Sequence, residues 1–384
     1  MSAPATLAPA FDLLAAYEPG GVLVERAGLG VATGGAGRWV PVDEVGPALR
    51  AAPTGAVAAG VLPFAGEGAL RLADRIVRRT SPGETQLVGE AASFARAHGR
   101  AAPADAFTAV QRHPHPSPEG YADAVATATA RMGADGDLRK VVLARTLEVD
   151  AGRALDPSAL AHRLRAVDPD AWTFAAPSGD GTLVGATPEL LVSRRGLKVR
   201  SNPLAGTAPR AGDPAEDHAN ADRLLASPKD REEHAIVVEA VAAVLGPRCD
   251  DLRWDPEPVL QATPTVWHLS TRFEGTLSSP APSALDLALA LHPTPAIGGW
   301  PVATSLDAIA SLEPFERGGY AGPVGWVDAE GDGEFAIALR CALLRGERAT
   351  LYAGAGIVAA SDPAAEVDET ERKFGSFLDA LRWG

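Results

Sequence analysis

Lysine is the scarcest charged residue in this chain of 384 residues, which has four lysines beside 31 arginines. Arginine stays protonated at any physiological pH, whereas lysine can lose its proton and act as a base. A chain that prefers arginine is expected to keep lysine where arginine cannot replace it. Lys140, which opens the strand-like run 140–145, is therefore the first candidate for chemistry. The alternative is a lysine at a strand end, with its stem over apolar surface and its head in water.

Cysteine, long hydrophobic runs and net positive charge are also lacking. Cys249 and Cys341 lie far apart in no Cys-x-x-Cys spacing, so the sequence indicates neither a disulfide framework nor a structural zinc site. No apolar run reaches the ~18 residues of a membrane helix, and Met1 to Tyr17 lacks the pattern of a signal peptide. The formal charge of −14 disfavours nucleic acid and anionic membranes as partners. We therefore expect a soluble cytoplasmic protein, in which an anionic substrate would need a local cluster of cations or a metal ion.

Glycine and proline are abundant, with 40 and 32 residues, which predicts short elements joined by many turns. Gly28 and Gly30 indicate a hairpin or bulge rather than a nucleotide-binding loop, because no phosphate-loop helix pattern follows them. Residues 113–118 predict a stiff extended connector, with Ser117 as N-cap and Pro118 at the first helical position. Beyond residue 138 the patterns predict an α+β fold with mostly antiparallel sheets. The predicted strands are 140–149, 182–185, 190–194, 323–327, 334–344 and 349–353, and the predicted helices are 156–166, 216–225, 229–245, 284–291, 303–312 and 365–382.

Two pairs of carboxylates stand three residues apart in predicted helices. Asp230 and Glu233 lie near the start of one helix, and Glu366 and Glu369 repeat the spacing near the C-terminus, one turn before Lys373. Residues three apart share one helix face. Two such pairs could therefore meet as four oxygen donors around a hard cation such as Mg²⁺. Alternatively, the carboxylates merely complement the helix dipole, and Glu369 makes an ordinary ion pair with Lys373.

Three further segments carry polar groups at turns or in a strand. Glu189 follows a proline at a corner before an apolar strand. If buried, it would have a raised pKa and could act as a general acid; otherwise it is a solvated turn residue. Segments 202–207 and 353–356 are predicted glycine turns whose backbone N–H groups could approach an anion. His268 lies in a strand-like stretch and is either a hydrogen-bonded core residue or part of a site.

Together these segments resemble the chorismate-utilising enzyme family, and within it the isochorismate synthases. The resemblance covers roughly residues 117–384, while residues 1–110 look like the divergent N-terminal half of the same fold. It implies one large α+β unit of two packed, mainly antiparallel sheets flanked by helices, with residues 1–115 as the N-terminal half and 116–384 as the chorismate-binding catalytic region. The matching segments, in the family's order, are 140–145, 185–191, 203–207, 229–234, 267–269, 291–296, 322–326, 340–342, 353–358 and 366–373.

The resemblance also implies a role for each candidate residue. Lys140 would be the general base that activates water for attack at C2 of chorismate, and Glu189 the general acid that protonates the departing C4 hydroxyl. His268 would act near the C1 carboxylate. The cofactor would be Mg²⁺, held directly or through water by the two carboxylate pairs Asp230 and Glu233, Glu366 and Glu369. The implied substrate-binding residues are Gly206, Thr207, Ala296, Tyr320, Arg340, Gly354 and Lys373.

Three positions bear on which member of the family this is. Ala205 stands where aminodeoxychorismate synthases carry a nucleophilic lysine, so water is the expected nucleophile. Ala296 stands where salicylate synthases typically have threonine, which favours stopping at isochorismate. Tyr320 instead resembles the tyrosine of salicylate synthases, so isochorismate formation followed by pyruvate elimination remains an alternative.

A non-catalytic chorismate-binding protein is the second alternative, and the retained Lys140, Glu189 and four carboxylates argue against it. The expected partner is chorismate alone, without nucleic acid or membrane, and the protein is expected to be a monomer. Its product would serve either menaquinone or siderophore synthesis.

Overall fold

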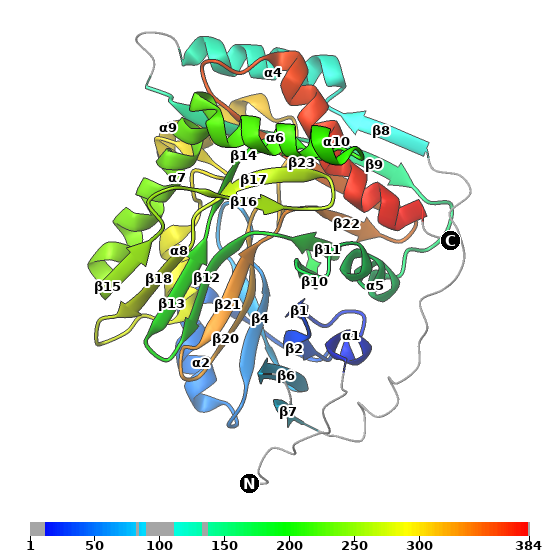
Figure 1. Cartoon of the computed structure of the whole chain (residues 1–384). Helices are drawn as coiled ribbons and strands as arrows, with labels where there is room; N and C mark the ends of the chain where they lie inside the picture. The colour runs from blue at the N-terminus through cyan, green and yellow to red at the C-terminus, as the bar shows by residue number, and fades with distance from the viewer. Residues whose placement is uncertain (1–11, 82–83, 90–110, 133–136, 383–384) are drawn as a thin grey trace.

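The computed structural model describes residues 12–81, 84–89, 111–132 and 137–382. Two large sheets form the body of the molecule, and every pairing between their described strands is antiparallel (Figure 1). The eleven-stranded sheet has, in order, β19 (Gly299–Trp300), β9 (Lys140–Asp150), β23 (Arg348–Ile357), β22 (Cys341–Arg345), β11 (Gly181–Thr187), β10 (Trp172–Ser178), β1 (Leu23–Arg26), β2 (Leu29–Thr33), β6 (Ile76–Ser81) and β7 (Glu84–Val88), with β8 (Gln111–His115) paired to β9. The nine-stranded sheet has β15 (Cys249–Trp254), β18 (Phe273–Leu277), β13 (Lys198–Asn202), β12 (Leu190–Arg195), β21 (Gly333–Ile337), β20 (Pro323–Asp328), β4 (Val57–Val61), β5 (Ala69–Ala73) and β3 (Gly37–Pro41).

A third, small sheet was not predicted. It consists of β14 (Leu204–Pro209), β17 (Val266–Ser270) and β16 (Val259–Ala262). In β14 the pairing register shifts between Ala205 and Thr207, because Gly206 bulges with a φ of +69° that favours glycine. This sheet carries Gly206, Thr207 and His268 toward the site described below.

Five helices begin where the sequence supplies a capping side chain followed by proline. Ser117, Asp156, Asp213 and Ser227 each accept a hydrogen bond from the first helical turn, and each is followed by proline at the first helical position. Asp362 caps the last helix in the same way, accepting from the Ala365 N–H. The helices are α1 (Leu13–Ala16), α2 (Val45–Ala51), α4 (Pro118–Arg131), α5 (Pro157–Val167), α6 (Pro214–Ala226), α7 (Pro228–Leu245), α8 (Ala284–Leu291), α9 (Val302–Leu312) and α10 (Pro363–Arg382), with short 3₁₀ turns at Val42–Glu44 and Gly246–Arg248.

Two hydrophobic cores divide the molecule into layers. One core joins the two large sheets, with Phe174 of the eleven-stranded sheet and Trp326 and Phe335 of the nine-stranded sheet among its buried residues. The second core lies where α1, α5 and α10 cover the eleven-stranded sheet, and it includes Leu160 and Phe374. The sheets therefore form a central sandwich with helices outside, as Figure 1 shows and as the α+β prediction required.

One predicted strand was wrong. Residues 334–344 form two strands, β21 and β22, which belong to different sheets. The chain changes direction at Arg340, whose φ of +49° is incompatible with a continuous strand. The apolar pattern runs through this break because both strands are buried, so the sequence alone did not reveal it.

Several other predictions were confirmed or refined. Gly28 lies in the turn of the β1–β2 hairpin, as predicted. The proposed connector at 113–118 is extended, but its first part is β8, paired along β9. Segment 353–356 is not a glycine turn, because it lies inside β23. The other predicted elements occur with their ends shifted by a few residues, and the helix over 284–291 has the predicted bounds.

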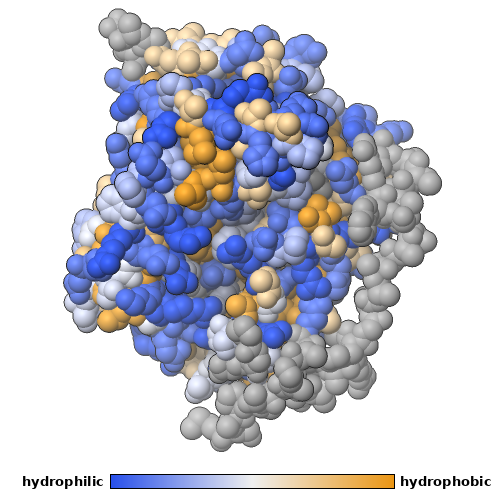
Figure 2. Space-filling model, in the orientation of Figure 1, coloured by the Kyte–Doolittle hydropathy of each residue, from blue (hydrophilic) through white to orange (hydrophobic). Residues whose placement is uncertain are grey.

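The surface is mostly hydrophilic on the face seen in Figure 2, with hydrophobic residues in small separate groups. No helix among the described residues is long and apolar enough to cross a membrane.

Candidate active site

One cavity of about 250 Å³ brings together segments from across the chain. Its walls are the corner between β11 and β12, the bulged strand β14, β17, the first turns of α7 and α10, and β23. Every predicted site residue lines this cavity except Lys140. The sequence prediction therefore located one site, although a shared wall does not test the role assigned to each residue. The residues that line it are Glu189, Gly206, Thr207, Asp230, Glu233, His268, Ala296, Tyr320, Arg340, Gly354, Glu366, Glu369 and Lys373.

Lys140 lies directly behind the cavity wall. Its side chain is 0% exposed, so the alternative of a strand-end lysine with its head in water is wrong. Its Nζ is 2.9 Å from Oε1 of Glu233, which does line the cavity. No hydrogen bond of good geometry from this Nζ occurs within the described part of the chain, so the ion pair alone holds the ammonium. A buried ammonium with unused donors can bind a further hydrogen-bond acceptor.

Glu189 is buried at the Pro-bounded corner and is 3% exposed. Burial raises the pKa of its carboxyl to about 7, although the Leu204 N–H and the charges of Lys140, Lys373 and Arg340 oppose the increase. The Leu204 N–H donates to Oε1 over 3.4 Å. A carboxyl group with a pKa near neutrality has the property that a general acid working at neutral pH needs.

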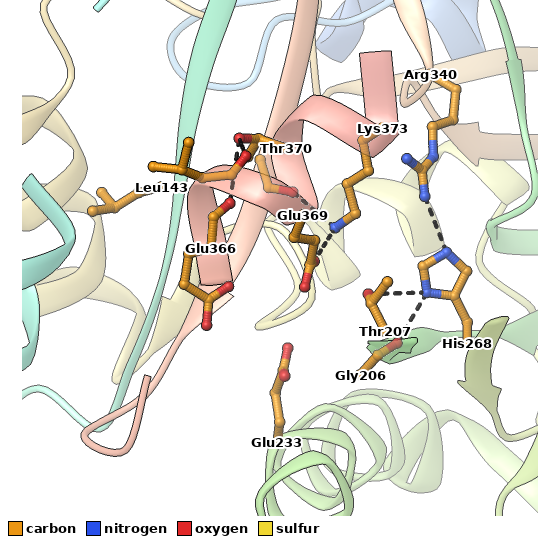
Figure 3. A network of polar contacts seen from close by, with 12 residues as sticks. Leu143, Gly206, Thr207, Glu233, His268, Arg340, Glu366, Glu369, Thr370 and Lys373 are labelled. Atoms are coloured by element: carbon orange, nitrogen blue, oxygen red, sulfur yellow. Dashed lines mark hydrogen bonds and ion pairs between the residues drawn. The ribbon is translucent and has the colours of Figure 1, made fainter. Parts of the chain in front are cut away.

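The four predicted metal-binding carboxylates come from two helices. Figure 3 shows Glu233 on α7 pointing toward Glu366 and Glu369 on α10. Each of these three pairs with a different lysine: Glu233 with Lys140 at 2.9 Å, Glu366 with Lys229 at 3.1 Å, and Glu369 with Lys373 at 2.5 Å. The ordinary ion pair considered for Glu369 and Lys373 is thus present. Asp230 lies beside the bulge at Gly206. If Gly206 carried a side chain, its Cβ would stand 3.0 Å from the Cβ of Asp230.

The chemistry of this donor set fits a hard divalent cation. All four side chains offer oxygen, the ligand that Mg²⁺ prefers. Burial raises the pKa of Asp230 and Glu366, and the neighbouring carboxylates Glu233 and Glu369 raise them further. A cation among them would relieve this repulsion. As the side chains stand, however, no group of three or more His, Cys, Asp or Glu in the described ranges is close enough to hold a metal ion, and three of the four carboxylates are paired with lysines.

His268 is held in one neutral form by its hydrogen-bond partners, which are Arg340 at Nε2 and both the Gly206 carbonyl and, over 3.4 Å, the Thr207 hydroxyl at Nδ1. Arg340 can only donate, so its contact of 3.1 Å makes Nε2 of His268 an acceptor without a proton. The Gly206 carbonyl can only accept, so Nδ1, at 3.0 Å, carries the proton. Burial, with the charges of Arg340 and Lys373, lowers the pKa of His268 well below its usual value. This arrangement, visible in Figure 3, favours positioning of Arg340 over proton transfer by His268.

The remaining walls are aromatic or small. Tyr320 stacks on Tyr352, with ring centroids 4.9 Å apart and planes 12° from parallel. Burial raises the pKa of the Tyr320 hydroxyl, which keeps it neutral. Ala296 also lines the cavity, with a side chain of a single methyl group. Lys373 also donates to the Gly354 carbonyl over 2.9 Å, which fixes the ammonium at the end of the cavity near Arg340.

The sequence analysis assigned no role to several residues that line the cavity. Lys229 is the clearest omission, since the scarcity of lysine that singled out Lys140 applies equally to it. Tyr352 gave no periodic or motif signal, because its place depends on the pairing of β23 with β22 and β9. Other lining residues without an assigned role include Val142, Leu204, Ile297, Leu339, Gly356 and Arg372.

Comparison with known proteins gives consistent matches. Residues 78–382 match the family model described as chorismate binding enzyme. The isochorismate synthase DhbC of Bacillus subtilis is 47% identical over 275 residues, which is 70% of this chain and 69% of that protein. The isochorismate synthase EntC of Escherichia coli is 43% identical over 273 residues, which is 71% of this chain and 69% of that protein.

Solved structures match over nearly the whole chain. A putative 2,3-dihydroxybenzoate-specific isochorismate synthase, DhbC from Bacillus anthracis, superposes with a TM-score of 0.86 at 36% identity and covers 97% of this chain and 99% of its own. MenF, the menaquinone-specific isochorismate synthase of Escherichia coli, has a TM-score of 0.85 at 26% identity, with 99% and 93% coverage.

Proposed function

Because the chain belongs to the chorismate-binding enzyme family, we propose that it is an isochorismate synthase, an isomerase that converts chorismate to isochorismate. Water adds at C2 of the ring and the C4 hydroxyl leaves. The observation that carries this function is the pair of buried groups at one cavity, a lysine ammonium and a glutamic acid with a pKa of about 7. The carboxyl group would supply the acid for such an exchange, and the lysine, once it has lost its proton, would supply the base.

In the proposed mechanism Lys140 and Glu189 act on two different bonds. Lys140, in its neutral form, takes a proton from water at Nζ while the water oxygen bonds to C2. Glu189 gives its carboxyl proton to the departing C4 hydroxyl, which leaves as water. Water is thus consumed and released in equal amount, and the enzyme returns to its starting state when the proton on Lys140 is passed back to Glu189 through solvent. Glu233, 2.9 Å from Lys140, would orient the base.

The substrate is a dianion and the protein is acidic, so local positive charge has to bind it. We assign Arg340 and Lys373, together with backbone at Gly206 and Gly354, to the enolpyruvyl carboxylate. His268, neutral and hydrogen-bonded to Arg340, would hold that guanidinium in place. Thr207, Ala296 and Tyr320 would complete the substrate-binding wall.

Magnesium would be held by Asp230, Glu233, Glu366 and Glu369, directly or through water. When bound, it would supply positive charge for the C1 carboxylate of the substrate. Excess EDTA is expected to abolish turnover, and added Mg²⁺ to restore it. Glu233→Gln and Glu369→Gln are expected to raise the Mg²⁺ concentration needed for half-maximal rate, since each removes one anionic donor. Full activity in excess chelator would refute the magnesium requirement.

The reaction itself is tested by incubating the pure protein with chorismate and Mg²⁺ and separating the products by chromatography. Isochorismate as the main product is expected. Salicylate and pyruvate as main products would instead identify a salicylate synthase, the alternative that Tyr320 favours. Binding of chorismate without turnover would identify a non-catalytic binding protein.

The choice between the first two outcomes rests on Ala296. Ala296→Thr adds a hydroxyl beside Tyr320 and is expected to increase the ratio of pyruvate to isochorismate. An unchanged ratio would show that Ala296 does not determine the product. We further propose that the protein works as a cytoplasmic monomer and that its isochorismate serves either menaquinone or siderophore synthesis.

A further inference from the structure

Lys229 lies at the solvent side of the carboxylate cluster, which consists of Asp230, Glu233, Glu366 and Glu369. The mechanism above assigns no role to this lysine. It lies in the first turn of α7, directly after Ser227 and Pro228. Its Nζ donates to Oε1 of Glu366, on α10, over 3.1 Å. The Glu366 side chain is 4% exposed, whereas that of Lys229 is 36% exposed. The ammonium therefore reaches a buried carboxylate from the solvent side.

Lys229 lies among the carboxylates of the cluster. It directly precedes Asp230 and stands one helical turn before Glu233 on α7, and its ammonium reaches across to Glu366 on α10. Lys229 therefore has the position of a resident cation between the two helices, although it makes a direct contact with Glu366 alone among the four carboxylates.

The other two lysines of the cluster are less free to leave. Lys140 is fully buried. Lys373 is 13% exposed, and it is fixed by a second bond to the Gly354 carbonyl as well as by Glu369. Lys229 has one acidic contact, a long flexible stem and an open path to water, so it can move its head into solvent at little cost.

We propose that Lys229 is the resident counter-cation of the carboxylate cluster, which a divalent metal ion must displace from Glu366 in order to bind. This inference rests on the magnesium site of the proposed function. In the metal-free protein Lys229 neutralises part of the cluster and holds Glu366 away from the other carboxylates. It thereby stabilises the metal-free state and weakens metal binding, so Lys229 sets the metal concentration at which the enzyme becomes active.

The test measures metal binding without substrate. Titration calorimetry with Mg²⁺ alone compares the wild-type protein with Lys229→Gln and with the matched control Lys198→Gln. Lys198 is the one lysine of this sequence outside the cluster; it is exposed on β13 and bonded to Thr276. Both variants lose one positive charge, so they differ only in where it is lost.

Removing the competing ammonium is expected to tighten Mg²⁺ binding about tenfold, the effect of ~1.4 kcal/mol. Lys198→Gln is expected to stay within about twofold of wild type, since its charge is screened by solvent. In EDTA, Lys229→Gln is expected to melt below the control, and saturating Mg²⁺ should remove that difference. Lys229→Arg keeps the charge and should bind Mg²⁺ about as weakly as wild type.

Unchanged or weaker Mg²⁺ binding by Lys229→Gln would overturn the proposal, and so would Lys229→Arg behaving like Lys229→Gln. If Lys229→Gln unfolds in EDTA but refolds with Mg²⁺, the proposal is supported. Wild-type protein that binds no Mg²⁺ at millimolar concentration would overturn both the metal site and the role of Lys229. Wild-type protein that binds Mg²⁺ and makes isochorismate, with an unaffected Lys229→Gln variant, would overturn the role of Lys229 alone.

Discussion

Lys140 occupies a buried position that a permanently charged residue would fill only at high cost. Desolvating an ammonium is unfavourable unless a partner compensates, and here Glu233 is the compensating carboxylate. The fully buried stem and the single ion pair explain why this chain, rich in arginine elsewhere, has lysine at residue 140. A five-donor guanidinium would need several more acceptors than the site offers.

Substitution of Lys140 distinguishes two roles for this residue, a catalytic base and a counter-ion that only neutralises charge. Lys140→Arg keeps the charge but cannot give up its proton near neutral pH. If Lys140 is the base, Lys140→Arg and Lys140→Ala should both lose at least ~10²-fold in kcat/KM at saturating Mg²⁺. Lys198→Arg, at an exposed site, is the control and should retain wild-type activity. A Lys140→Arg variant within a few-fold of wild type would show that Lys140 only neutralises charge.

Glu189 predicts the pH dependence of the reaction. Its pKa is raised by burial to about 7, and only the protonated carboxyl can protonate a leaving group. The value of kcat/KM should therefore fall as the pH rises through about 7. Glu189→Gln cannot donate this proton and should lose at least ~10²-fold, without a titration near neutrality. A wild-type profile that stays flat from about pH 6 to 9 would exclude this acid.

At the scale of the elements, strand β23 contains Gly354 and Gly356 in the segment that was predicted to be a turn, and both glycines are required by the close packing of the site. A Cβ on Gly356 would stand 2.2 Å from Oε1 of Glu233 and 3.3 Å from Cε of Lys140. A Cβ on Gly354 would stand 3.0 Å from the Tyr320 hydroxyl. The backbone of β23 therefore packs directly against the Lys140–Glu233 pair. The glycines are needed because a side chain at these positions would overlap with Glu233 or Tyr320, and they do not form a turn.

Gly356→Ala is expected to disturb this pair while leaving the fold intact. The methyl group must push Glu233 away by about 1 Å, and a misplacement of that size can cost about 10²-fold in rate. We expect kcat/KM to fall at least about tenfold with an unchanged far-ultraviolet circular dichroism spectrum. Gly212→Ala is the matched control, because a Cβ there meets nothing within 4 Å. Equal activity of the two variants would contradict the close packing of Gly356 against the pair.

Sequence patterns predicted the elements better than they predicted how the elements meet. Helix α8 was placed with the correct bounds, and in the structure a complete capping box of Ser283 and Asp286 precedes its apolar run. The β21–β22 break was missed, because a chain that passes from one buried sheet to another keeps its apolar pattern. Motif positions located the cavity residues, and the local spacing of Glu369 and Lys373 indicated their ion pair. The pairs Glu233–Lys140 and Glu366–Lys229 join side chains from distant elements, which no local pattern records. The assigned roles remain predictions.

At the scale of the whole molecule, strands from the first quarter of the chain take part in both large sheets. Within the residues described, β1, β2, β6 and β7 belong to the eleven-stranded sheet, and β3, β4 and β5 to the nine-stranded sheet. Every residue of β4 is buried, and β4 pairs with β20. Residues 1–115 were interpreted as one half of a single fold, and the part of that half that is described adds strands to both sheets.

A fragment of residues 116–384 should therefore not fold, although it contains every predicted site residue. The loss of β1 and β4 would leave β10 and β20 as unpaired edges next to an opened core. We expect aggregation, or a circular dichroism spectrum without a cooperative thermal transition, and no turnover. A soluble fragment with isochorismate synthase activity would show that the N-terminal strands are dispensable.

The placement of the four lysines has a practical consequence for chemical labelling. Three of them lie at the cavity and are buried to different degrees, and only Lys198 lies elsewhere. An amine-reactive reagent would modify Lys198 first and Lys229 next, while Lys140 would be protected in the folded protein. Mass spectrometry of labelled peptides would thus report how far the cavity opens, from the labelling of Lys140 relative to that of Lys198. Few other reactive amines would interfere, since the chain has only four lysines.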